Sequence, residues 1–351
     1  MRIPRFAADR RIAAAFVTVF VTALSTALHA QTPDQTPEQP PGQTPELRVL
    51  TYDSFVSDWG PGPAIEQAFE ATCGCDLVFS SAGDGAAMLA RLMLTGARSE
   101  ADVVLGLDSN LTAAATASGL FAPHGLSPAL DLPVAWEDPL FLPFDWGWFA
   151  FVHDTRRTPN APGSFVELIA SDLNIVIQDP RSSTPGLGLL MWIKAAYGDE
   201  AAAIWQGLAP RIVTVTPGWS EAYGLFLEGE ADMVLSYTTS PAYHLIAEDT
   251  PDFAAVGFVE GHYLQVEVAG ILANSDQPDL AAQFMEFMTS DAFQSVIPVT
   301  NWMYPAVTPA DGLPEGFETL LRPETTLLLS AEDAASLRDA ALSEWRDALA
   351  R

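Results

Sequence analysis

Short apolar runs alternate with helix-like segments in the first third of the chain. The runs Leu47–Tyr52, Asp76–Ser80 and Ala101–Leu107 have the length of strands, and the segments between them, Pro63–Thr72 and Gly85–Gly96, place apolar residues at helical spacing. The third of these strands is almost continuously apolar, which is typical of a sheet that helices cover on both faces. The alternation therefore predicts an α/β fold with a largely parallel sheet.

Two longer extended segments indicate a body of two lobes. Pro143–His153 and Tyr263–Leu272 are long enough to cross from one lobe to the other. A capped C-terminal helix is also predicted, because Ser330 stands three residues before Asp333 at its start. The remaining predicted elements are strands at Asn174–Asp179, Ile212–Thr216 and Met233–Ser236 and helices at Leu187–Tyr197, Leu280–Met288, Ala292–Ile297 and Ser330–Ala350.

The first 46 residues are predicted to lie outside this fold. Residues 1–30 combine four arginines, an apolar run and small residues that end at Ala30, as in a secretory signal peptide. Residues 31–46 repeat Gln-Thr-Pro three times, which predicts a disordered spacer. We predict that residues 47–147 and 270–305 form lobe 1, that residues 148–269 form lobe 2, and that residues 306–351 form a C-terminal helical segment packed on the lobes.

The chain is strongly acidic. It has 45 acidic and 16 basic residues, a formal net charge of −29, and Lys194 as its single lysine. Because no basic stripe is available to neutralise phosphates, the composition excludes nucleic acid as a partner. The charge could help to attract a cationic ligand, but a surface adapted for solubility explains it equally well.

The two cysteines, Cys73 and Cys75, are separated by one glycine. In an exported chain an even cysteine count suggests a disulfide, and Gly74 would ease the tight bend that this spacing requires. Such a bond closes almost no loop, so we expect it to add little stability. Two thiols without clustered histidines do not make a four-ligand zinc site, so no metal is expected.

Aromatic and hydroxyl side chains gather in the segment Thr216–His244. Trp219, Tyr237 and Tyr243 share it with the small hydroxyl residues at 238–240. Large flat rings beside short hydrogen-bonding groups suit a flat and partly polar ligand. Taken alone, the same pattern is also that of core aromatic residues beside a turn.

Six blocks of sequence are long enough to compare with known families. They are TYDSFVSDWGPGP (51–63), ADVVLGLDSNL (101–111), QDPRSSTPGLGLL (178–190), GWSEAYGLFLEGEADMVLSYTTSPAYH (218–244), EGHYLQVEVA (260–269) and NWMYP (301–305). Together they resemble the periplasmic thiamine-binding proteins of bacterial ABC importers, over about Leu47 to Arg351. The resemblance implies a two-lobed periplasmic-binding-protein fold of type II with a ligand cleft between the lobes. It also implies a non-enzymatic monomer of the periplasm that passes thiamine or its phosphates to a permease with an ATPase.

The family's ligand contacts carry over position by position. The Tyr and Trp faces would stack on the aminopyrimidine of thiamine and hold its thiazolium cation. The resemblance implies no cofactor and no catalytic residue. The implied ligand-binding residues are Tyr52, Trp59, Asp84, Gly85, Ser183, Thr184, Trp219, Tyr237, Thr238, Thr239, Ser240, Pro241, Tyr243 and Trp302.

Several of these positions have a second interpretation. The carboxylate of Asp84 could offset the cation, and it could equally cap the helix that follows it. Ser183 and Thr184 precede a predicted helix, where they could hold an anionic tail or simply cap the helix. Arg181 could approach a phosphate or form a surface ion pair, and His244 and His262 fit structural roles better than ligand roles.

Two other functions share this architecture. A thiamine-cleaving enzyme would use Cys73 or Cys75 as its nucleophile, but cysteines this close in an exported chain favour a disulfide. A ferric-ion-binding import protein would use adjacent tyrosines, whereas Tyr237 and Tyr243 are six residues apart. Both remain alternatives to thiamine binding.

Overall fold

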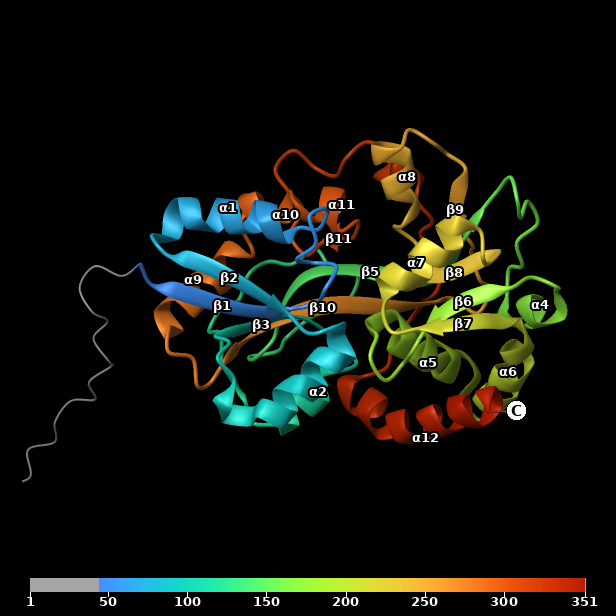
Figure 1. The fold of residues 1–351 in the computed structure, drawn as a ribbon. Coiled ribbons are helices and arrows are strands. Elements are labelled where there is room, and N and C mark those ends of the chain that lie inside the picture. The colour runs from blue at the N-terminus through green and yellow to red at the C-terminus, as the bar shows by residue number, and fades with distance from the viewer. Residues whose placement is uncertain (1–43, 351) are drawn as a thin grey trace, which may run out of the picture. The chain divides into compact units, whose positions relative to one another are not determined.

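Twelve strands pair into one mixed sheet in the part of the chain that the structure describes. The computed structural model describes residues 44–350, so the predicted signal peptide and most of the predicted spacer lie outside the described residues. The strand order is β2-β1-β3-β10-β5-β8-β6-β7, with β4, β9, β11 and β12 paired beside this path (Figure 1). The strands are β1 Glu46–Thr51, β2 Asp76–Ser81, β3 Val103–Asp108, β4 Phe121–Ala122, β5 Leu142–Asp154, β6 Ile175–Gln178, β7 Ile212–Thr216, β8 Met233–Tyr237, β9 Phe253–Ala255, β10 His262–Leu272, β11 Tyr304–Pro305 and β12 Thr326–Leu327.

The middle of the sheet corrects the prediction of a largely parallel arrangement. Strand β1 pairs in parallel with β2 and β3, and β6 pairs in parallel with β7 and β8. Between these groups, β10 runs antiparallel to β3 and β5, and β5 runs antiparallel to β8. The chain passes along β5 and, more than a hundred residues later, runs back beside it along β10 in the opposite direction, so these two paired strands are antiparallel. Both strands are buried along their whole lengths and correspond to the two predicted crossings.

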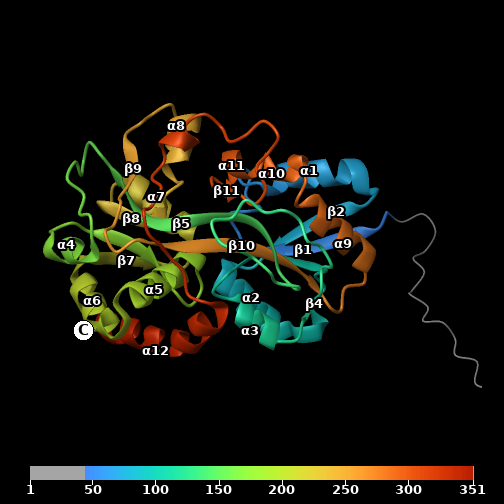
Figure 2. The ribbon, with the colours of Figure 1, turned by 180° about the vertical axis from the view of Figure 1, so that it is seen from behind.

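Helices cover both faces of the sheet. On the side of β1–β3, α1 and α10 lie over one face and α2 and α3 over the other, as the two opposite views agree (Figures 1 and 2). The α-helices are α1 Gly62–Cys73, α2 Gly85–Thr95, α3 Thr112–Ala117, α4 Phe165–Ala170, α5 Thr184–Tyr197, α6 Ala201–Leu208, α7 Trp219–Glu228, α8 Pro241–Ala247, α9 Pro278–Phe287, α10 Asp291–Gln294, α11 Ile297–Thr300 and α12 Ala331–Leu349. Within the described residues, no helix has the length and apolar character that a membrane span requires.

The C-terminal helix α12 connects the two sides of the sheet. It contacts α3 on one side and α5 and α6 on the other. Ser330 caps it as predicted, because its hydroxyl accepts a hydrogen bond from the Asp333 N–H at 3.1 Å and donates one to the Asp333 carboxylate at 2.8 Å. Residues Thr44–Arg351 group as one compact unit, so the predicted lobe boundaries stay a prediction.

The predicted helix Ala292–Ile297 is wrong in its extent. The structure has two short helices instead, α10 and α11, which are separated by Ser295 and Val296. Pro298 lies in the first turn of α11, where its missing N–H is harmless, whereas inside a continuous helix it would break the hydrogen-bond ladder. Helix α5 starts at Thr184, three residues before its predicted start, with Pro185 in its first turn.

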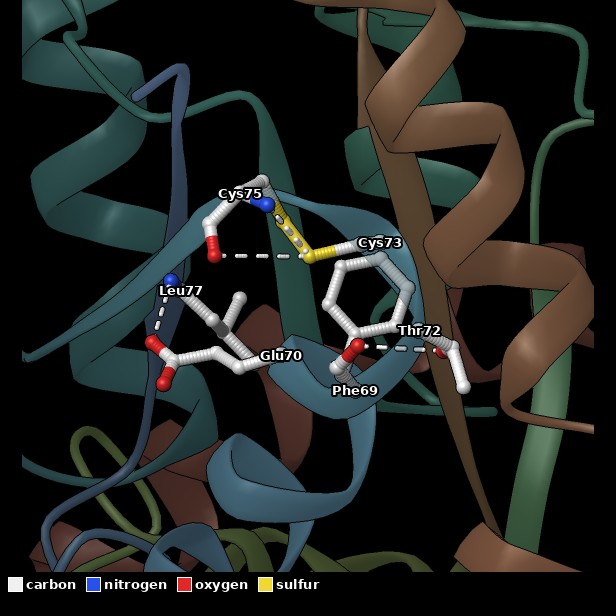
Figure 3. Close-up of a disulfide and its surroundings, with 6 residues drawn as sticks. All are labelled: Phe69, Glu70, Thr72, Cys73, Cys75 and Leu77. Atoms are coloured by element: carbon white, nitrogen blue, oxygen red, sulfur yellow. Dashed lines mark hydrogen bonds between the residues drawn. A yellow bond between two sulfur atoms is a disulfide. The ribbon is translucent and has the colours of Figure 1, made fainter. Parts of the chain in front are cut away.

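The two cysteines form a disulfide at the turn between α1 and β2 (Figure 3). Gly74 between them has a φ of +65° and ends α1 in the left-handed conformation that glycine adopts most easily. Beside this turn, the Leu77 N–H donates to the Glu70 carboxylate at 2.9 Å. Because the bond encloses only three residues, it constrains the unfolded chain little.

Candidate functional site

A cavity of about 440 Å³ lies among segments that are far apart in the sequence. The loop after β1, the loop after α11 and strand β10 contribute to it. The starts of α5, α7 and α8 contribute as well, through their first turns or the residues just before these helices. A cavity of this size is within the range of small-molecule sites. Its lining consists of Tyr52, Ser54, Trp59, Asp84, Pro185, Trp219, Ser220, Tyr223, Gly224, Leu227, Tyr237, Ser240, Tyr243, Glu267, Thr300, Asn301, Trp302 and Met303.

The sequence prediction and this lining overlap in part. Eight predicted residues line the cavity: Tyr52, Trp59, Asp84, Trp219, Tyr237, Ser240, Tyr243 and Trp302. Six others do not line the cavity and are buried: Gly85, Ser183, Thr184, Thr238, Thr239 and Pro241. A ligand-binding role for these six stays a prediction.

Five rings form the aromatic wall of the cavity, namely Trp59, Trp219, Tyr223, Tyr243 and Trp302. Trp59 faces Trp219 at a centroid distance of 6.2 Å, and Trp219 stacks on Tyr223 at 5.0 Å. Tyr243 and Trp302 meet edge to face at 5.4 Å. Rings in this number offer faces for a flat ligand and for a cation.

Two rings of the wall, those of Trp302 and Trp219, are positioned by a backbone conformation and by a side-chain hydrogen bond, respectively. Trp302 has a φ of +56°, one of two positive values among the non-glycine residues of the described chain. A bulky residue in this conformation is strained, and such strain gathers at functional sites. Trp219 is held by its indole N–H, which donates to the Ser236 hydroxyl at 2.8 Å.

The helix starts of α2 and α5 meet at Asp84. Its carboxylate accepts hydrogen bonds from the Gly85 N–H at 2.9 Å and from the Ser183 hydroxyl at 2.8 Å. Burial raises the pKa of Asp84, and the Ser183 hydrogen bond opposes that shift. Asp84 therefore caps α2 and also lines the cavity, while the Ser183 hydroxyl caps no helix.

Glycine at position 85 makes this junction possible. A Cβ there would come within 2.4 Å of the Thr184 hydroxyl and 3.0 Å of the Gly106 carbonyl oxygen. The Thr184 hydroxyl has no hydrogen-bond partner among the described residues. The two helix starts thus pack closely against each other.

Two residues of the predicted hydroxyl run, Thr238 and Thr239, do not line the cavity. The side chains of Thr238 and Thr239 are fully buried, and the Thr239 hydroxyl lies 3.7 Å from the Met303 sulfur. Ser240 does line the cavity, and its hydroxyl bonds to that of Ser236 at 2.6 Å. Only one of the three hydroxyls is therefore positioned to meet a ligand directly.

A cluster of carboxyl and neutral polar side chains reaches the cavity through Tyr52, Glu267 and Asn301, and we call it the acidic base of the cavity. Of its members, only Tyr52 is part of the sequence prediction. The acidic base consists of the carboxyl groups of Glu267 and Asp145 with the neutral side chains of Tyr52, Gln265 and Asn301. Burial is the largest cause of the raised pKa of both carboxyl groups. A signal existed in the sequence, because Glu267 is a charged residue inside a strand that is mostly apolar.

Tyr52 reaches this base because β3 has a glycine beneath its ring. Gly106 has a φ of +102°, and a Cβ there would lie 2.2 Å from the Tyr52 ring. The ring therefore lies directly on the strand, and its hydroxyl donates to Glu267 at 2.9 Å. Burial and the neighbouring carboxylates raise the pKa of Tyr52, so it remains a donor.

No basic side chain lines the cavity within residues 44–350. Arg181 pairs with Asp179, which is the surface alternative of the prediction. His244 bonds to the Tyr223 hydroxyl and to Glu248, and His262 bonds to the backbone of Phe149 and Phe258. Both histidines have a pKa lowered by burial and hold structural positions.

The described residues bear on the two alternative functions in different ways. Both cysteines are joined in the disulfide, so neither is a free thiol for nucleophilic attack. No group of three or more His, Cys, Asp or Glu side chains among the described residues is arranged to hold a metal ion. The cavity instead combines rings, carboxyl groups and helix starts.

Comparisons with known proteins agree with this arrangement. A family model described as bacterial extracellular solute-binding protein matches residues 61–295. The thiamine-binding periplasmic protein of Escherichia coli (strain K12) is 54% identical over 310 residues, covering 88% of this chain and 94% of that protein. The protein of the same name from Brucella melitensis is 50% identical over 309 residues, covering 87% and 92%.

Solved structures show the same relationship. A periplasmic thiamin binding protein superposes with a TM-score of 0.86 at 52% identity, covering 90% of this chain and 99% of that chain. Iron-bound HitA from Pseudomonas aeruginosa, at 20% identity and a TM-score of 0.69, covers 87% and 99% and shares the fold alone. The chain belongs to the family of bacterial extracellular solute-binding proteins and, within it, groups with the periplasmic thiamine-binding proteins. The predicted two-lobed periplasmic-binding-protein fold is confirmed.

Proposed function

We propose that this bacterial extracellular solute-binding protein binds thiamine in the cavity described above. The observation that carries the proposal is the lining, which combines the aromatic wall with the carboxyl groups of Asp84 and Glu267 and has no basic side chain among the described residues. Thiamine presents a flat aminopyrimidine and a cationic thiazolium. Aromatic faces attract both a flat ring and a cation, at about 0.5–2 kcal/mol for each such contact.

The proposal includes a place in transport. The protein acts as the substrate-binding component of an ABC importer, as a monomer in the periplasm, and delivers its ligand to a membrane permease that works with an ATPase. It carries out no catalysis. The names of relatives that are 50% or more identical support this role, and so does the predicted signal peptide at residues 1–30.

Thiamine monophosphate and thiamine diphosphate are proposed as further ligands. Pro185 and Ser220 line the cavity from the first turns of α5 and α7. The first N–H groups of a helix have no partner inside the helix, and they attract anions. A phosphate in this site would therefore be held by neutral donors instead of basic side chains.

A titration of the purified protein tests the proposal. Calorimetry with thiamine and its two phosphates should give a stoichiometry near one per chain. Tryptophan fluorescence should be quenched, because Trp59, Trp219 and Trp302 line the cavity. Ferric citrate in a parallel titration tests the iron-binding alternative. Neither heat nor quench with any thiamine compound would contradict the proposal.

A further inference from the structure

Two carboxyl groups lie side by side at the base of the cavity. Glu267 of β10 lines the cavity and stands opposite Asp145 of β5 in the strand register. Residues that are directly opposite each other in an antiparallel pair have neighbouring side chains on the same face. Glu267 is 6% exposed and Asp145 is fully buried, so both carboxyl groups are shielded from water. Two neighbouring buried carboxyl groups repel each other when both are ionised, which favours a state in which one of them carries a proton.

The side chains that hydrogen-bond to this pair are neutral. The Tyr52 hydroxyl donates to Glu267 at 2.9 Å, and the Gln265 amide donates to the other oxygen of Glu267 at 2.7 Å. The Asn301 amide donates to Asp145 at 2.6 Å. The second oxygen of Asp145 has no hydrogen-bond partner among the described residues. Two full negative charges in this position would lack a counter-charge, and a buried uncompensated charge is costly.

The titratable groups around the pair are acidic or phenolic. Asp108 of β3 is also opposite Glu267 in the strand register, and Asp84 acts on Glu267 from the start of α2. The phenol of Tyr237 also lies within the reach of these carboxylates. Arg338 of α12 acts on Asp108, but it is not among the groups that influence Asp145 or Glu267. No cationic side chain of the described residues compensates the charge of the pair, so we infer that the two carboxyl groups share one proton.

We propose that the Glu267–Asp145 pair is the counter-charge for the ligand's cation and gives up its shared proton to solvent when the cation binds. The proposal rests on the proposed function. Before binding, the pair holds one proton and a charge of one minus. After binding, both groups are carboxylates, the charge of two minus faces one positive charge, and the released proton is taken up by the buffer.

The consequence is selection for charge as well as for shape. A neutral ring of the same outline would stack on the aromatic wall but would not drive the proton out. The affinity for a cation should rise with pH while the pair still holds its proton, and it should level off once the pair is ionised in the free protein. At most one proton is released, so the affinity changes by at most about tenfold for each pH unit.

Calorimetry in two buffers with different ionisation enthalpies measures the released proton directly. Thiamine is compared with its neutral isostere, in which a thiophene replaces the thiazolium. For the wild type, proton release is expected with thiamine, and clearly less with the isostere. Glu267→Gln keeps the shape of the side chain but removes its charge, so it should abolish the additional proton release. It should also weaken thiamine roughly tenfold or more, and the isostere less than about threefold.

Two further variants keep the test decisive. Asp145→Asn should also remove the additional proton release, which covers the case in which Glu267→Gln does not fold. Asp108→Asn removes a buried carboxyl group of the neighbouring strand that does not line the cavity, and it should retain the release. Thiamine binding with equal proton release in the wild type and both pair variants would overturn this inference and leave the proposed function standing. Loss of the release only in Asp108→Asn would also overturn it. No thiamine binding by the wild type would instead contradict the proposed function.

Discussion

The aromatic wall and the acidic base of the cavity are built in different ways. The wall rings pack mostly on one another, and Trp59 remains 53% exposed. The base is buried, and its hydrogen bonds join distant parts of the chain, such as Tyr52 with Glu267, 215 residues apart. We therefore expect a substitution in the wall to affect one ring contact, whereas a substitution in the acidic base affects hydrogen bonds between several strands and loops.

The base should make folding stability depend on pH. Burial raises the pKa of Asp108, which flanks the base, from 3.8 to about 7. The folded state therefore binds a proton that the unfolded state has lost, so this group's contribution to stability falls as pH rises from about 4 to about 7. Asp108→Asn removes that dependence. Its free energy of unfolding, relative to the wild type, should rise by up to about 1.4 kcal/mol for each pH unit in this window, the largest effect expected.

Urea denaturation at several pH values measures this difference. A matched control is Asp102→Asn, since Asp102 is a buried carboxylate that accepts from the Arg48 N–H and the Ser275 hydroxyl. This control gives the cost of an Asp→Asn change at a buried site with two hydrogen-bond donors, and the result for Asp108→Asn is compared with it. A constant difference between Asp108→Asn and the wild type would show that Asp108 is ionised throughout and that the burial argument is wrong.

Removing a ring of the wall should weaken every thiamine compound alike. Trp302→Ala deletes a ring that lines the cavity and packs against Tyr243, and loss of a buried aromatic anchor commonly costs about 2 kcal/mol or more. Affinities for thiamine and thiamine monophosphate should fall by the same factor. Trp302→Phe keeps a ring and should recover most of the loss. A loss confined to one ligand would show that the ring contacts only the part in which the two ligands differ.

A substitution at the junction between the helix starts should also lower the affinity for all ligands by the same factor, with a smaller effect than the loss of a wall ring. The sequence alone leaves two roles open for Ser183 and Thr184, binding of an anionic tail or capping of the helix, and the structure directs the Ser183 hydroxyl to Asp84. Ser183→Ala should therefore cost about 1 kcal/mol of binding for both thiamine and thiamine monophosphate. Ser182→Ala is the control, because its hydroxyl donates to the Pro217 carbonyl. A loss of affinity for thiamine monophosphate alone would mean that the Ser183 hydroxyl contacts the phosphate tail.

The smallest effect is expected at the exposed edge of the wall. Trp59→Phe shortens a half-exposed ring that still faces Trp219, so the affinity for thiamine should fall by only about 0.5 kcal/mol. Fluorescence titration measures both this affinity and the share of the quench that belongs to Trp59. A loss as large as that of Trp302→Ala would mean that ligand binding buries Trp59 far more than the structure does.

Much of this protein was predictable from local pattern. The apolar runs predict β1, β2 and β3, and the most continuously apolar of them, β3, is the one that is buried along its whole length. The spacing of Ser330 and Asp333 predicts the start of α12, because capping is a local interaction. Of the wall rings, the local pattern singles out Trp219 and Tyr243, the family resemblance adds Trp59 and Trp302, and Tyr223 is not predicted.

Other features were decided by tertiary structure alone. The antiparallel centre of the sheet arises because β5 and β10 become neighbours across more than a hundred residues, and no local pattern carries that pairing. Ser183 meets Asp84 only because two helix starts converge where Gly85 and Gly106 leave room. The proton shared by Glu267 and Asp145 depends on burial and on neighbours from three separate segments. Sequence determines which side chains are available, and the fold determines which charges must share the same low-dielectric space.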